Sequence, residues 1–212
     1  IIKIFFYVSW KETLIYLRNS LTKPKIKLVK NNNLYKYMVE KDTLAKNFHE
    51  PHFKEIVKLL IKKGNHCLDL GAYIGVHSII MSKKAKNGHV YSFEPDSLLF
   101  SLMQLNLIKN KVKNIKTYKL AVLNKTADCV NLSDFNYNAN NLNLGVRIVE
   151  NKKKYNSGNL SASIKIDELK LPKIDFVKID IQGSEYLALQ IMKKIINSDR
   201  PNFFIEIEEF YL

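Results

Sequence analysis

The stretch that decides the fold is HCLDLGAYIG, residues 66–75. Its first half is apolar around one acid, Asp69, which predicts a buried strand. Gly71 and Gly75 then predict a turn, and apolar residues at helical spacing from Val76 to Lys84 predict a helix. Such a strand, turn and helix hold polar or anionic ligands, because glycine turns the backbone sharply and the first helical N–H groups lack partners.

A second predicted strand, residues 89–93, ends in Glu94. An acid in this place, roughly 20 residues after a glycine turn, holds a nucleotide ribose through its hydroxyls. The glycine pattern is D-x-G-x-x-x-G and not the dinucleotide fingerprint G-x-G-x-x-G. Asp69, two positions before the first glycine, suits a ligand with an amino group and a sulfonium, which points to S-adenosyl-L-methionine. An ordinary strand–helix turn with a solvated acid is the alternative, and Glu94 favours the ligand site.

Strands and helices alternate along most of the chain, which predicts an α/β fold with a mostly parallel sheet and helices on both faces. Residues 1–46 are expected to form an N-terminal extension, with a loop at 22–33 and a short strand at 34–39, and residues 47–212 the main domain. Helices are expected at 49–63, from a cap at Asp96 to Lys109, and from a Ser184 cap through 185–197. Further strands are expected at 115–122, 128–132, 162–166, 175–180 and 203–208. Residues 133–160 are rich in asparagine and interrupt this order.

Four residues fall at or near predicted strand ends: Asp69, Glu94, Ala121 and Asp180. Ligands of open parallel sheets bind outside the carboxyl ends of the strands, where the strand order reverses. We therefore expect one site to gather these residues.

The net charge of +14 raises the question of a nucleic-acid partner. Nearly all the cations are lysines, and the arginines are Arg18, Arg147 and Arg200. Phosphate-binding surfaces usually use the bidentate arginine fork, and these lysines are scattered along the sequence. A lysine-rich composition therefore explains the charge better, and nucleic acid is not the expected partner.

The two cysteines, Cys67 and Cys129, fall on predicted buried strands and are expected to be reduced core residues. No cysteine–histidine pattern indicates a metal site. No apolar run is long enough to span a membrane, and no signal peptide is evident. A cytoplasmic location is expected.

Several blocks of this sequence resemble the FkbM-type S-adenosylmethionine-dependent methyltransferases: CLDLGAYIG (67–75), GHVYSFEPD (88–96), IDEL (166–169), DFVKIDIQGSE (175–185) and residues 201–206. The resemblance runs from about residue 47 to 208. It implies a Rossmann-like class I methyltransferase fold and methylation of hydroxyl oxygens on sugars or small metabolites. The family pattern continues for two more strands, so we expect a C-terminally truncated domain that lacks the last strands.

The resemblance also implies roles for individual residues. The cofactor-binding loop would comprise Asp69, Gly71, Ala72, Tyr73 and Gly75. Glu94 would hold the ribose, and Pro95, Asp96 and Ala121 would lie near the adenine. The family's acid–glycine–acid motif is matched by Asp180, Gly183 and Glu185. Tyr73 stands where the family usually has asparagine, and Gln182 where it usually has glutamate.

An alcohol needs a general base to attack a methyl sulfonium near neutral pH. Asp180 is the first candidate for this base, with contact to the cofactor amine or a metal as an alternative role, and Glu185 is the second. His77 is expected to be a partly exposed histidine without a role, with a ligand contact as the alternative. The insertion around Tyr137, Asn141, Asn143 and Arg147 is expected to bind the acceptor or to be a solvated loop.

Three other functions stay open. A nucleotide-binding oxidoreductase would share Glu94 and the sheet, but would need the missing three-glycine fingerprint. A nucleic-acid methyltransferase would suit the charge, but usually has an N-P-P-[YF] motif after the fourth strand, where DIQG (180–183) stands. A non-catalytic binding domain is the third.

Overall fold

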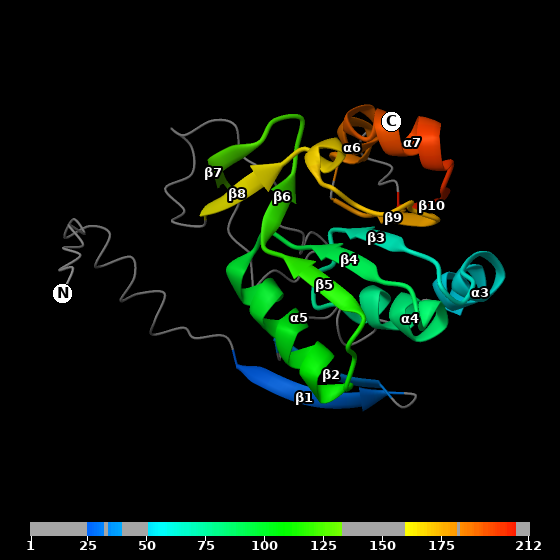
Figure 1. Cartoon of the computed structure of the whole chain (residues 1–212). Coiled ribbons are helices and arrows are strands. Elements are labelled where there is room, and N and C mark those ends of the chain that lie inside the picture. The colour runs from blue at the N-terminus through cyan, green and yellow to red at the C-terminus, as the bar shows by residue number, and fades with distance from the viewer. Residues whose placement is uncertain (1–24, 32–33, 40–50, 133–159, 182, 207–212) are drawn as a thin grey trace, which may run out of the picture.

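A computed structural model describes residues 25–31, 34–39, 51–132, 160–181 and 183–206. Its centre is a five-stranded, wholly parallel sheet with the strand order β10-β9-β3-β4-β5 (Figure 1). The strand bounds are β3 Cys67–Leu70, β4 Val90–Phe93, β5 Ile115–Tyr118, β9 Phe176–Ile179 and β10 Asn202–Ile205. The chain runs outward from β3 to β5 and then returns to the other side of β3, so the order reverses at β3. The predicted fold class is confirmed.

Helices cover both faces of this sheet (Figure 1). One face packs against α6 (Glu185–Ile191) and α7 (Lys193–Asp199), with Leu68 and Leu70 of β3 in that core. The other face packs against α3 (Pro51–Leu60) and α4 (Val76–Ala85), where Cys67 lies in the core. Successive strand residues point to opposite faces, so Asp69 shares the face of Cys67.

The helix α5 (Ser97–Lys109) begins where the sequence predicts. The Asp96 carboxylate accepts hydrogen bonds from the N–H groups of Leu98 and Leu99, each at 2.9 Å, and so caps the helix. Asn106 of α5 is fully buried and donates to the carbonyl of Ile74 at 2.8 Å. This bond fastens α5 to the loop between β3 and α4.

An antiparallel hairpin of β1 (Ile26–Asn31) and β2 (Leu34–Val39) packs on α5. The expected loop at 22–33 is therefore wrong for residues 26–31. The side-chain amides of Asn106 on α5 and of Asn110, the residue that caps its C-terminus, form hydrogen bonds with the main chain of Tyr37 and Tyr35, respectively. These contacts between distant segments fix the hairpin, and local sequence does not reveal them.

A small second sheet has the order β6-β8-β7, with bounds β6 Leu120–Val122, β7 Ala127–Asn131 and β8 Leu160–Ile164. The single strand expected at 115–122 is therefore two strands in two sheets, because β6 leaves β5 to pair in parallel with β8. Cys129 on the edge strand β7 is exposed, which corrects its expected burial, whereas Cys67 is buried as predicted. A short 3-10 helix, η1 (Ile166–Glu168), follows β8.

The helix expected at 185–197 is broken at Met192 into α6 and α7. The cause lies in η1, where the Asp167 carboxylate accepts hydrogen bonds from the N–H groups of Lys194 (2.9 Å) and Ile195 (3.3 Å). These bonds satisfy the first turn of a new helix. Ser184 stands at the N-cap position of α6, as expected, but its side chain makes no capping hydrogen bond.

No helix in the described part of the chain is long and apolar enough to cross a membrane.

Candidate active site

The loops after β3, β4 and β9 meet at the carboxyl edge of the sheet. The N–H groups of Gly71 and Ala72 donate to the carbonyl of Phe93 at 3.1 and 2.9 Å, which joins the loop after β3 to the end of β4. The N–H of Asp180 donates to the carbonyl of Leu70 at 3.0 Å, which joins the end of β9 to β3. Asp69, Glu94 and Asp180, three of the four residues expected at strand ends, are thus on adjacent strands of one sheet edge.

A row of polar residues crosses the sheet beneath this edge. Asp69 of β3 is in register with Ser92 of β4 on one side and Lys178 of β9 on the other. Ser92 Oγ donates to Ser78 Oγ at 2.9 Å, and Ser78 Oγ donates to Asp69 Oδ2 at 2.5 Å. All four side chains are buried. Asp69 Oδ2 thus has a hydrogen-bond donor from α4, whereas Asp69 Oδ1 makes no hydrogen bond among the described residues and faces the ammonium of Lys178.

Lys178 joins the two acids at the centre of the row. Its Nζ lies 3.4 Å from Asp69 Oδ1 and 3.1 Å from Asp180 Oδ2, and it donates to the carbonyl of Gly71 at 2.8 Å. Burial alone would lower the pKa of Lys178, but the charges of Asp180 and Asp69 outweigh burial and raise it. The ammonium therefore stays charged and holds the glycine loop against the end of β9.

Sequence reasoning missed Lys178, together with Ser78 and Ser92. Lysine is almost never fully buried unless it is paired, so a lysine in a strand is usually assigned to the solvent. One signal was available: β9 is a central strand with apolar neighbours, which leaves Lys178 no exposed side.

Glu94 is also buried, but main-chain donors hold its carboxylate. Oε2 accepts from the N–H of Tyr73 at 2.8 Å, and Oε1 accepts from the N–H of Asp96 at 3.0 Å. Burial raises the pKa of Glu94 to about 8, although the two N–H donors and the charge of Lys178 act in the opposite direction. Each carboxylate oxygen has about two acceptor directions, so each keeps capacity for one further hydroxyl donor. This remaining acceptor capacity fits the two hydroxyls of a ribose.

The glycines of the turn make room for protein atoms. Both Gly71 and Gly75 have φ +80°, a region that favours glycine. A Cβ on Gly71 would lie 1.8 Å from the carbonyl oxygen of Asp180, and one on Gly75 would lie 2.7 Å from Cγ of Met103. Tyr73 has φ 54° between them, a conformation that is uncommon for a bulky residue. The turn is therefore closely packed against β9 and α5.

The other predicted cofactor residues lie around these loops. Ala72 is buried, Pro95 is half-buried, and the Asp96 carboxylate caps α5. Ala121 is buried in β6 of the second sheet, packed with Leu123 and Val130. Their contact with a cofactor stays a prediction.

Glu185 lies in the first turn of α6, where its Oε1 accepts from the N–H groups of Ile181 (3.1 Å) and Gly183 (3.0 Å). The carboxylate thus closes the loop that follows Asp180. Gln182 and the insertion residues Tyr137, Asn141, Asn143 and Arg147 lie outside the described residues. His77, expected to be partly exposed, is 4% exposed and packs against the ring of Phe53 with the centroids 4.0 Å apart.

No group of three metal-ligating side chains is found within the described ranges.

The model of the methyltransferase FkbM domain family matches residues 69–211 of this chain. No curated protein matches the sequence. The crystal structure of methyltransferase FkbM from Methylobacillus flagellatus is 17% identical, with a TM-score of 0.48; the match covers 78% of this chain and 46% of that one. The structure of M. jannaschii TYW2 in complex with AdoMet is 22% identical, with a TM-score of 0.35, and covers 45% and 43% of the two chains.

The chain thus spans less than half the length of these two solved structures. The family match includes the glycine turn, Glu94 and the end of β9 that carries Asp180. It confirms the resemblance seen in the sequence, and with it the S-adenosyl-L-methionine cofactor. This chain belongs to the methyltransferase FkbM domain family.

Proposed function

We propose that this chain is a methyltransferase that transfers a methyl group from S-adenosyl-L-methionine to a hydroxyl oxygen of a sugar or another small metabolite. The observation that supports this most is the carboxyl edge of the sheet. There, hydrogen bonds join the segments at the ends of β3, β4 and β9, and Glu94 and Asp180 lie at this same edge. The acceptor class comes from the family resemblance of the sequence.

The proposed cofactor residues are Asp69, Gly71, Ala72, Tyr73, Gly75, Glu94, Pro95, Asp96 and Ala121. Glu94 would accept hydrogen bonds from the ribose hydroxyls with the acceptor capacity that its two main-chain bonds leave. When bound, the cofactor supplies an electrophilic methyl group on a sulfonium. The acidic residues of this edge suit a cationic ligand, because Asp69 and Asp180 together carry one more charge than Lys178 offsets.

The chain's own residues must place the acceptor hydroxyl and receive its proton. Asp180, whose side chain is 21% exposed at the strand end, is the proposed general base. Asp180 would take the proton of the acceptor hydroxyl, whose oxygen would then receive the methyl group that the bound cofactor supplies. Lys178 would hold Asp180 in place for this step, and positioning of this kind supplies much of an enzyme's rate.

Methyl-labelled cofactor and a panel of hydroxylated sugars, small metabolites and RNA would test the proposal. We expect label in a hydroxylated small molecule, and a loss of at least 100-fold in turnover for Asp180→Asn, because general-base catalysis contributes roughly 10²–10⁴-fold. Asp128→Asn, an exposed acid on β7, is the matched control and should keep its activity. Label that enters RNA alone would overturn the proposed acceptor class.

Glu185→Gln separates the two proposed bases. Glutamine keeps an oxygen that can accept from Ile181 and Gly183 but loses the charge. If Glu185 is the base, turnover falls as far as in Asp180→Asn. If it only closes the loop, turnover stays within a few-fold of the unmodified chain.

A contact of Asp180 with the cofactor amine, the alternative role, would weaken cofactor binding in Asp180→Asn. Calorimetry with S-adenosylhomocysteine on the same variant therefore tells the two roles apart, because loss of a base leaves that affinity largely unchanged.

A further inference from the structure

The charge of the chain is divided unevenly between two parts of the fold. Residues 71–127, which form α4, β4, α5, β5 and β6, contain nine lysines and two acids, Glu94 and Asp96, both of them buried. Residues 160–206 contain seven cations and seven acids. The first part therefore has a net charge of +7, half of the total of +14, and no exposed acid.

Most of these lysines gather at the end of the sheet away from the proposed active site. The ends of α4 and α5 lead into β4 and β5, so both lie at the amino edge of the strands (Figure 1). The Asn114 amide fastens the two ends together, because its Nδ2 lies 3.1, 3.0 and 3.1 Å from the carbonyls of Ser82, Lys86 and Gly88. The lysines at these two ends are Lys83, Lys84, Lys86, Lys109, Lys111 and Lys113.

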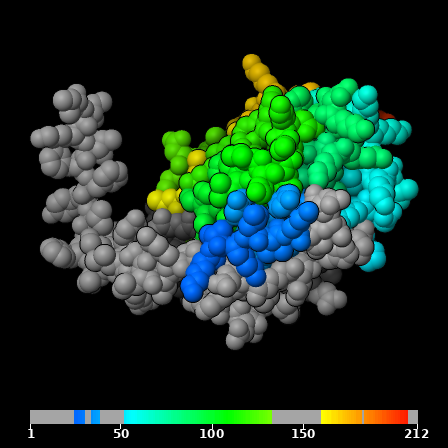
Figure 2. Space-filling view, turned by 90° about the horizontal axis from the view of Figure 1, so that it is seen from below, coloured from blue at the N-terminus to red at the C-terminus, as the bar shows by residue number. Residues whose placement is uncertain are grey.

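The hairpin extends this cationic surface. Lys30 of β1 and Lys109 of α5 both lie over the ring of Tyr35, with Nζ 5.4 and 5.2 Å from its centroid. Figure 2 shows the hairpin in blue against the green part of the chain that includes α5. We call the surface formed by Lys30 and the six lysines at the ends of α4 and α5 the lysine face.

Ordinary structural preferences explain single lysines here, but not the whole face. A helix C-terminus favours cations, and lysine on an edge strand such as β5 discourages strand pairing. Neither preference excludes acids, which are absent from the exposed surface of residues 71–127. A surface with one sign of charge attracts polyanions.

Exposed aliphatic side chains lie on the two elements that carry Lys30 and Lys109. Of the seven large hydrophobic residues that are exposed in the described chain, four lie on β1 and α5: Ile26, Leu28, Leu105 and Ile108, the last of them 73% exposed. Nucleic-acid surfaces add aromatic stacking and arginine to their charge. Lysines mixed with exposed isoleucine and leucine suit instead the boundary between anionic headgroups and acyl chains.

We propose that the lysine face docks on a lipid bilayer that carries anionic headgroups. Docking at the amino edge of the strands would leave the carboxyl edge, with Glu94 and Asp180, open to solvent. This inference does not depend on the proposed methyl transfer.

Vesicle co-sedimentation of the full chain tests the proposal, with phosphatidylcholine vesicles that contain either no phosphatidylglycerol or roughly one third. We expect binding to the anionic vesicles that weakens at high salt. The triple variant Lys109→Glu, Lys111→Glu, Lys113→Glu should lose at least tenfold in vesicle affinity.

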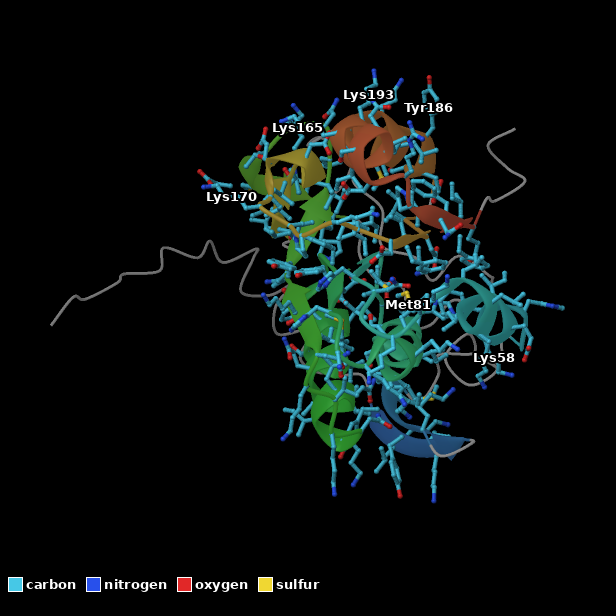
Figure 3. The ribbon with its side chains drawn as sticks, turned by 45° about the vertical axis from the view of Figure 1, so that its right-hand side comes forward. Lys58, Met81, Lys165, Lys170, Tyr186 and Lys193 are labelled. Atoms are coloured by element: carbon cyan, nitrogen blue, oxygen red, sulfur yellow. The ribbon has the colours of Figure 1, made fainter. Side chains whose placement is uncertain are left out.

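The matched control is the triple variant Lys170→Glu, Lys193→Glu, Lys194→Glu, which changes the net charge by the same amount. Lys170 and Lys193 lie at the end of the molecule opposite the hairpin (Figure 3), and the control should bind within about twofold of the unmodified chain. Thermal melts verify that both variants fold.

A second variant, Ile108→Ser, tests the aliphatic part of the face. It should reduce the binding that persists at high salt without changing the charge. Equal losses in the two triple variants would show that net charge alone attracts the vesicles, and would overturn the proposal. Absence of vesicle binding would also overturn it. If structured RNA then bound and the first triple variant lost that binding, the lysine face would be a nucleic-acid surface.

Discussion

Asp69 and Glu94 lie near the carboxyl ends of neighbouring parallel strands, and both are buried, but the protein compensates their charges differently. Asp69 has the Lys178 ammonium at 3.4 Å and the Ser78 hydroxyl at 2.5 Å. Glu94 has two main-chain N–H donors, and its pKa is raised to about 8. A buried carboxylate with a cation beside it can support the fold as an ion, whereas one held by neutral donors stays ready for a ligand that brings further donors. Asp69 thus has its charge compensated within the fold, whereas the Glu94 oxygens keep acceptor capacity for a ligand.

The largest effect should come from removing the cation of the Asp69 region. Lys178→Met leaves Asp69 buried without its counter-charge and releases the carbonyl of Gly71, so we expect a loss of about 4 kcal/mol in the free energy of unfolding. Lys173→Met, an exposed lysine five residues earlier, is the control and should change stability by less than about 0.5 kcal/mol. Urea denaturation measures both. Equal stability of the two variants would contradict the role given to Lys178.

Gly71→Ala tests how closely the loop beside Asp69 packs on β9. The new Cβ would meet the carbonyl oxygen of Asp180 at 1.8 Å, in addition to the strain of φ +80°, so we expect a loss of about 3 kcal/mol. Gly64→Ala is the matched control, because Gly64 also has a positive φ, +92°, but nothing lies within 4 Å of its Cβ position. It should cost about 1 kcal/mol. Similar losses in the two variants would mean that backbone strain alone determines the effect.

Glu94 should make the stability of the unliganded chain depend on pH. Burial raises the pKa of Glu94 from 4.5 to about 8, so between these values the folded chain keeps a proton that the unfolded chain has lost. The contribution of Glu94 to stability is therefore complete below about pH 4.5 and is lost as the pH rises to about 8. Between about pH 6 and pH 8 the loss should be about 2 kcal/mol.

Urea denaturation of Glu94→Gln over the same pH range checks this expectation, because glutamine does not titrate. The difference in unfolding free energy between the variant and the unmodified chain should change with pH in the direction given above. A difference that is constant from pH 6 to pH 8 would show that Glu94 keeps an ordinary pKa.

The smallest effect concerns the hydroxyl next to Asp69. Ser78→Ala removes the donor to Asp69 Oδ2 but leaves Lys178 in place, so we expect a loss of about 1 kcal/mol. Ser82→Ala, one turn later on α4, removes a buried hydroxyl that bonds only the carbonyl of Ile79 in its own helix and should cost less. A loss in Ser78→Ala as large as in Lys178→Met would mean that the hydroxyl, and not the ammonium, compensates the acid.

The local parts of the fold were predictable from the sequence. The glycine turn, the strand ending at Glu94 and the Asp96 cap follow from hydrophobic spacing and from side chains that bond their own neighbours. The family resemblance, which the match over residues 69–211 confirms, rests on these same segments.

Features that depend on distant contacts were not predictable. The strand expected at 34–39 is confirmed as β2, but its partner β1 and the packing of the hairpin on Asn106 and Asn110, about 70 residues later in the chain, were not foreseen. The break between α6 and α7 depends on Asp167, and the pairing of Lys178 with Asp69 joins segments on either side of the insertion. In each case a polar side chain forms a hydrogen bond or an ion pair with a group that is distant in the sequence. Hydrophobic periodicity does not indicate such contacts.

The central claim is that Glu94 is a ribose-binding carboxylate, and calorimetry with S-adenosylhomocysteine tests it most directly. We expect binding to the unmodified chain, no binding of NADH, and at least a tenfold loss of affinity in Glu94→Gln, with Glu55→Gln on the exposed face of α3 as the unaffected control. Because the ribose hydroxyls favour the ionised carboxylate, binding near neutral pH should release a proton in the unmodified chain but not in Glu94→Gln. Unchanged affinity in Glu94→Gln, or binding of NADH in place of S-adenosylhomocysteine, would contradict the claim.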